Sequence, residues 1–162
     1  MQRTLAVANY FIQKSAYTIT PLQLIKIVYI SYGYTLAILD KKLFSEEIEA
    51  WQFGPVVPSI YHTFKHYKKE SVTELSTEIT FDDNFHFIEE IFIMDKEDEN
   101  YEVIIKILDK VWDSYKQYSG YELIDLTHKK NTPWSQVFKH NQHHIGLEDD
   151  AIKKYYTELL AG

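Results

Sequence analysis

Residues 19–39 read ITPLQLIKIVYISYGYTLAIL, the longest apolar run in the chain. Thr20 is a good N-cap, Pro21 suits the first helical position, and Gln23 stands where its side chain can complete a Thr-x-x-Gln capping box. Apolar side chains cover nearly every side of the helix that this start signal predicts. Polar residues such as Lys26 interrupt the run, which is not typical of a membrane span. We therefore expect a central helix wrapped by other helices.

Length and composition indicate one domain over residues 1–162. The chain is 45% hydrophobic and 15% aromatic, which is enough to form a core at this length. It carries 17 basic and 24 acidic residues, for a net charge of −7. This charge disfavours nonspecific binding to nucleic acid or anionic lipid and suits a basic protein partner.

Two absences narrow the function classes further. The chain has no cysteine, which excludes disulfides, thiolate metal sites and cysteine nucleophiles. Its first residues, MQRTLAVANYF, lack the apolar segment and cleavage site of a signal peptide. We expect a cytoplasmic protein with no membrane association.

The remaining pattern predicts a mainly α fold, a single compact helical domain around a buried central helix with a small antiparallel β element. Helices are expected at 3–15, 58–68, 97–118, from Ser119 to about His128, from Pro133 onward and at 147–160. An extended piece at 48–53 should end at Gly54-Pro55, and two short strands at 78–81 and 86–94 could pair with it. Tyr61 and Leu159 are expected to face the core from their helices.

Candidate catalytic and metal-binding motifs are weak. His62 and His66 have the four-residue spacing of a zinc pair but lack the accompanying general-base Glu, so a solvated helix face is the better interpretation. His140, His143 and His144 could bind zinc only adventitiously. The serines lack a Gly-x-Ser-x-Gly elbow, and five scattered glycines make no phosphate loop. We expect no metal, no cofactor and no catalytic residue, and an enzyme ranks third among the hypotheses.

Three sequence blocks resemble the Panacea domain of the SocA-like antitoxin family, whose members are also described as phage-associated proteins. The blocks are TPLQLIKIVYISYGYTLAI, FSEEIEAWQFGPVVPSIYHTFKHY and ELIDLTHKKNTPW, and the resemblance runs from about Ala6 to Val137. The matching positions are Pro21, Leu22, Leu24, Lys26, Gly33, Ala50, Trp51, Gly54, Pro55, Val57, Pro58, Tyr61, Leu126, Thr127, His128, Pro133 and Trp134. Asp40 departs from the family's common Gly, and the expected absence of a helix-turn-helix domain puts transcriptional autoregulation in doubt.

The resemblance implies a nonenzymatic antitoxin that binds and silences a cognate toxin encoded beside it. Members of this kind neutralise diverse toxin domains by direct contact, and one is implicated in delivering its toxin to a protease. The alternative is therefore a phage or mobile-element adaptor that brings a client to a protease or host factor, with a protease or chaperone as second partner. DNA binding by the isolated chain is not expected.

The partner surface is expected in the block from residue 51 to residue 69. Tryptophan and tyrosine are favoured interface anchors, the Gly54-Pro55 turn rigidifies the loop, and the following helix carries a locally basic edge. The expected partner-binding residues are Trp51, Phe53, Tyr61, His62, Lys65, His66 and Lys69.

Overall fold

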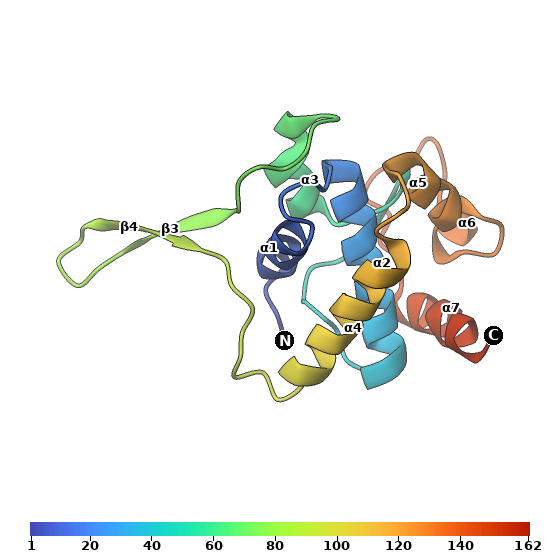
Figure 1. The fold of residues 1–162 in the computed structure, drawn as a ribbon. Coiled ribbons are helices and arrows are strands. Elements are labelled where there is room, and N and C mark those ends of the chain that lie inside the picture. Colours follow the sequence, from blue (N-terminus) through green and yellow to red (C-terminus); the bar gives the residue numbers. More distant parts are fainter.

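The computed structural model describes residues 1–162 and places α2 (Pro21–Leu39) at the centre of the fold (Figure 1). The predicted capping box is confirmed, because Gln23 N donates to Thr20 Oγ1 at 3.4 Å and Thr20 N donates to Gln23 Oε1 at 3.0 Å. The helix ends at Asp40, which has a left-handed conformation. By length and composition α2 could span a membrane, but most of its residues are buried against other helices, as in a core helix.

Six further α-helices and one 3-10 turn complete the helical part. These are α1 (Thr4–Lys14), α3 (Pro58–Phe64), η1 (Lys65–Tyr67), α4 (Tyr101–Tyr115), α5 (Gly120–His128), α6 (Pro133–Val137) and α7 (Asp149–Ala161). Five of the helices, α1, α3, α4, α5 and α7, contact α2. Their apolar faces, together with residues of the first strands and the loops, form one cluster of 32 buried residues. The predicted mainly α fold class is confirmed.

Helix starts lie within two residues of the predicted positions except at α4. Asp95 accepts a hydrogen bond from Glu97 N and Asp98 accepts one from Asn100 N, both at 2.9 Å. These side chains hold the backbone in turns that compete with the helix. The helix therefore begins at Tyr101, four residues later than predicted, and it also ends three residues early.

The strands form two separate antiparallel hairpins. One hairpin pairs β1 (Glu49–Trp51) with β2 (Gly54–Val56), and the other pairs β3 (Thr77–Phe81) with β4 (Phe87–Ile91). The expected pairing between residues 48–53 and the later strands is wrong. The reason is local, because the chain reverses at Gln52 and Phe53, so that Gly54-Pro55 begins a strand. The β3–β4 hairpin projects away from the helices (Figure 1).

Two side chains expected in the core lie at the surface. Tyr61 is 36% exposed, because α3 is only seven residues long and buries just Ile60 and Phe64. Leu159 is also exposed, since α7 packs through Ile152 and Tyr156 and its last turn extends past that contact.

Candidate interaction surface around the first hairpin

The β1–β2 hairpin contacts α2 and α5 through a close approach at Gly54. This residue has a φ of +107°, which residues with a Cβ rarely adopt. A Cβ at Gly54 would lie 2.7 Å from Lys26 Nζ and 3.0 Å from Thr127 Oγ1. Glycine is therefore needed both for the backbone conformation and for the distance between the hairpin and the two helices.

Lys26 fixes the hairpin to the central helix. Its side chain is fully buried, and Nζ donates a hydrogen bond of 2.9 Å to the carbonyl oxygen of Pro55. Burial lowers the pKa of the Lys26 amine to about 7. The neutral amine keeps its donor hydrogens, so the bond to Pro55 does not require the charged form.

A column of stacked rings supports the other side of the hairpin. Trp134 of α6 donates from Nε1 to the backbone oxygen of Trp51 at 2.6 Å. Its ring stacks on His128, with centroids 3.8 Å apart, and on Phe138 at 4.7 Å. Burial, and then the charge of Lys26, lower the pKa of His128, whose buried Nε2 has no hydrogen-bond partner. His128 and Trp134, both from the sequence block ELIDLTHKKNTPW, therefore have a structural role, because they support the hairpin.

An aromatic and basic group lies on the outer side of β1, and we call it the Trp51 cluster: Trp51, Tyr61, His62 and Lys65. The ring of Trp51 lies 4.9 Å from that of Tyr61 and 6.2 Å from that of His62, and its Nε1 donates to Glu49 Oε2 at 2.6 Å. Lys65 Nζ lies 5.9 Å from the centre of the Tyr61 ring. The structure therefore brings four of the seven predicted site residues together across β1, α3 and η1.

The other three predicted residues lie outside this cluster. Phe53 is 61% exposed at the tip of the hairpin and lines a hollow on the side of α5 and α6. His66 is in η1, and its ring lies 4.3 Å from the ring of Tyr67. Lys69 is exposed beyond η1. Since α3 ends at Phe64, His62 and His66 do not share one continuous α-helical face.

The loop between α6 and α7 borders the hairpin. The sequence did not indicate this contact. Ala50 N donates to the oxygen of Ile145 at 2.8 Å, and Leu147 N donates to the oxygen of Ile48 at 2.7 Å. These hydrogen bonds join segments that are far apart in sequence, so no local pattern signals them. The loop thereby brings the predicted His-rich patch to the edge of β1.

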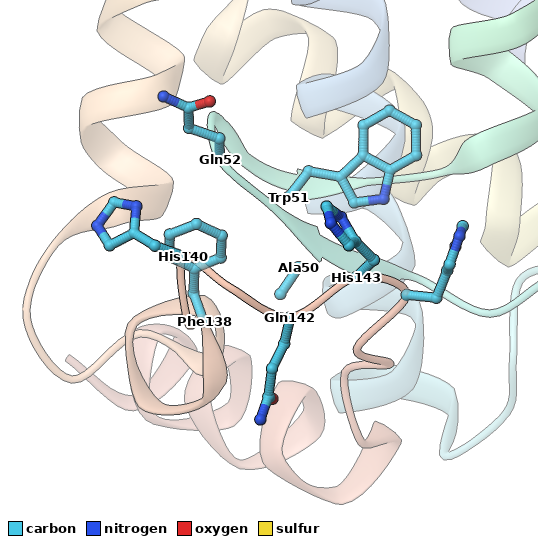
Figure 2. Close-up of a pocket in the computed structure, with 8 residues that line it drawn as sticks. Ala50, Trp51, Gln52, Phe138, His140, Gln142 and His143 are labelled. Carbon is cyan, nitrogen blue, oxygen red and sulfur yellow. The ribbon is translucent and has the colours of Figure 1, made fainter.

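The loop and the hairpin enclose a hollow of about 340 Å³ (Figure 2). It is lined by Ala50, Trp51, Gln52, Phe138, His140, Gln142, His143 and His144. Beside it, Glu49 Oε2 lies 3.4 Å from His144 Nδ1. No three His, Asp or Glu side chains in the structure are grouped as metal ligands would be. Rings, amides and imidazoles in this arrangement can bind a protein or peptide surface by stacking and hydrogen bonds.

Comparison with known proteins covers the same region. A family model described as "Antitoxin SocA-like, Panacea domain" matches residues 24–135, which include both hairpins and the Trp51 cluster. The chain is 25% identical over 145 residues to "Antitoxin SocA" of Caulobacter vibrioides (strain NA1000 / CB15N). That alignment covers 88% of this chain and 73% of the relative. No solved structure gives a significant match.

Proposed function

We propose that this chain, which belongs to the SocA-like antitoxin family with a Panacea domain, neutralises a cognate toxin by direct protein contact. Membership in an antitoxin family suggests a regulatory, nonenzymatic role and a toxin partner in general. We further propose that residues 1–162 act as one domain in the cytoplasm and that the toxin is encoded by the adjacent gene.

One observation supports a binding function at this place in particular. The Trp51 cluster presents two large aromatic rings and a cationic side chain on an acidic molecule. Hydrogen bonds from Lys26 and Trp134 fix the hairpin that carries it. Aromatic anchors on a preorganised surface are typical of the residues that dominate binding energy in protein interfaces. We propose the Trp51 cluster, with Phe53, His66 and Lys69 around it, as the surface that contacts the toxin.

The function is tested by expressing the adjacent reading frame alone and together with this chain. We expect growth arrest from the neighbour alone, relieved by co-expression, and a stable complex of the two purified proteins. A neighbour that is harmless alone would remove the support for an antitoxin. If the neighbour is toxic but disappears faster when co-expressed, and only in cells with an intact protease, the alternative of a proteolytic adaptor is supported.

The surface is tested with the variant His62→Glu, Lys65→Glu, His66→Glu. Reversing the basic edge should weaken toxin binding at least about tenfold, mainly by slowing association, because opposed charges steer the encounter. Thermal unfolding should change little, since exposed substitutions typically alter stability by about 0.5 kcal/mol or less each. The matched control is Lys106→Glu with Lys154→Glu, which lowers the net charge equally on exposed positions of α4 and α7. Wild-type affinity in the triple variant would place the toxin contact elsewhere.

A further inference from the structure

The second hairpin presents an apolar face to solvent, and we call residues 77–93 the arm. Its register sets Ile79 opposite Glu89 and Phe81 opposite Phe87. Because side chains alternate along a strand and paired residues share a face, Ile79, Phe81, Phe87 and Ile91 lie on one face, which also carries Thr77 and Glu89, hydrogen-bonded to each other at 2.7 Å. Ile79 is 67% exposed and Phe87 77% exposed, and the rings of Phe81 and Phe87 touch each other at 4.9 Å between centroids.

The root of the arm is fixed to the helical body. Asn9 of α1 is buried, and its side chain donates to the backbone oxygens of Ser76 and Phe92, both at 2.9 Å. The same amide accepts a hydrogen bond from Ser76 N at 2.9 Å. Arg3 adds two hydrogen bonds to Glu78, at 2.6 and 2.8 Å, from the opposite face of β3. The arm therefore leaves the body in a defined direction (Figure 1), and Ile79 and Phe87 are exposed on it.

An apolar face of this kind indicates a partner. A two-stranded hairpin in water is at best marginally stable by itself, and contiguous exposed apolar patches on monomers usually mark interaction sites. The tip adds Phe85, which is 84% exposed, and the strand end adds Ile93. Both outer edges of the hairpin also carry backbone groups that no third strand pairs.

The charge of the arm selects the kind of partner. Five acidic residues and no Lys or Arg lie within it; the acidic residues are Glu78, Asp82, Asp83, Glu89 and Glu90. A second copy of the chain that docked arm to arm would bring the same negative charge against itself, and anionic lipid or nucleic acid would be repelled as well. A positively charged protein surface with an apolar groove fits both the apolar face and its acidic rim.

We propose that the arm is a second contact surface for the toxin and that it docks on a basic, apolar-grooved face of that protein. This inference rests on the proposed antitoxin function and adds to it the chemistry of the partner. The toxin then contacts two surfaces of opposite charge, the basic Trp51 cluster and the acidic arm.

The test compares the full chain with the variant Phe81→Thr, Phe87→Thr in binding to the purified product of the adjacent reading frame. Threonine keeps a high strand propensity, so the hairpin can persist without its apolar face. We expect the dissociation constant to rise at least about tenfold, as for loss of buried anchors at an interface. Leu159→Gln with Leu160→Gln is the matched control, because it removes two exposed apolar side chains from α7, and it should bind as the wild type does.

A measurement on the unaltered protein guards against misfolding of the variant. Hydrogen exchange of the wild-type chain should slow at residues 77–91 when the toxin product is added.

Glu89→Gln with Glu90→Gln should slow association at low salt and reduce its dependence on salt.

Each result answers one question. Binding by the wild type with equal binding by the Phe81 and Phe87 variant, and unchanged exchange at 77–91, would overturn the arm as a contact and leave the antitoxin function intact. Failure of the wild type to bind would overturn the function and this occupant together. A dimer, or sedimentation with phosphatidylcholine vesicles, that the same variant abolishes would show that the arm has a different occupant.

Discussion

Lys26 is a buried base, and its protonation is coupled to folding. The amine touches the hairpin through Pro55 and lies under Gly54, where no countercharge accompanies it. Burial lowers its pKa from 10.5 to about 7 in the folded chain. The unfolded chain, in which the amine is in water, therefore binds the proton more tightly than the folded one does between these two values.

We expect the free energy of unfolding to rise with pH from about pH 7 to about pH 9.5. In this range the folded state has lost the Lys26 proton and the unfolded state still holds it, so raising the pH favours folding by up to about 1 kcal/mol per pH unit. Below pH 7 the amine is charged in both states and this slope disappears. Urea unfolding at a series of pH values measures the slope.

The control for this pH dependence is Lys26→Met, which removes the titrating group and keeps much of its volume. The variant should show a nearly flat dependence over the same range. Above about pH 10 both proteins should lose stability, because burial raises the pKa of Tyr29 and Tyr32 and these phenols would ionise only on unfolding. A wild-type slope between pH 7 and 9.5 that persists in Lys26→Met would exclude Lys26 as its source.

At the scale of elements, the contact between α2 and α7 depends on Gly33. A Cβ at this position would lie 2.1 Å from Cδ2 of Tyr156, which is buried. The Tyr156 ring is held in place by Tyr34, at 4.8 Å between centroids, and by Tyr29, at 5.9 Å. The ring therefore cannot move aside without disturbing the aromatic contacts of the core.

Gly33→Ala should destabilise the protein by about 1 to 2 kcal/mol. Alanine is the better helix former by about 1 kcal/mol, but overpacking of a core typically costs about 1 to 3 kcal/mol, and the contact here is very short. In the background of Tyr156→Leu, which removes the ring, the same substitution should become neutral or stabilising. Denaturant unfolding of the four proteins measures this coupling, and an equal effect of Gly33→Ala in both backgrounds would contradict it.

The helices were predictable because their start signals are local. Thr20 and Gln23 lie within one turn, and their capping box forms as expected; Ser119 and Glu122, also within one turn, form a second capping box. The pairing of strands was not predictable in this way. Nothing near residues 48–53 distinguishes a partner four residues away from one thirty residues away, so the first hairpin was paired wrongly.

In the candidate surface too, the features that depend on local sequence were predictable and those that depend on distant segments were not. Trp51 and Tyr61 were predicted as anchors from residue type and position beside a rigid turn, and the structure places their rings 4.9 Å apart. The hydrogen bond from Trp134 to Trp51, and the loop that pairs with Ala50 through Ile145, join distant segments and have no sequence signal. The arm was expected only as two strands, since exposure of its apolar face depends on where its root is fixed.

For the whole molecule, charge is distributed unevenly around a net value of −7. The arm carries five acidic residues and no Lys or Arg, whereas the segment from His62 to Lys69 is the locally basic edge. Such a separation gives the molecule two faces that attract opposite charges, although the net charge still governs its encounters with a polyanion at long range.

The isolated protein should bind its own promoter DNA only weakly and in a salt-sensitive way. The basic edge offers Lys65, Lys68 and Lys69 to phosphates, so raising salt from 50 to 200 mM should weaken binding roughly fortyfold, as release of about three counterions predicts. Fluorescence anisotropy with the promoter duplex and with a scrambled duplex measures this, and we expect the same affinity for both, with a dissociation constant of about 1 μM or weaker at physiological salt. Lys65→Glu with Lys68→Glu should abolish the binding. Tight retention of the promoter over the scrambled duplex at physiological salt, by the protein without its partner, would show base recognition and would reopen transcriptional autoregulation as a role of this chain.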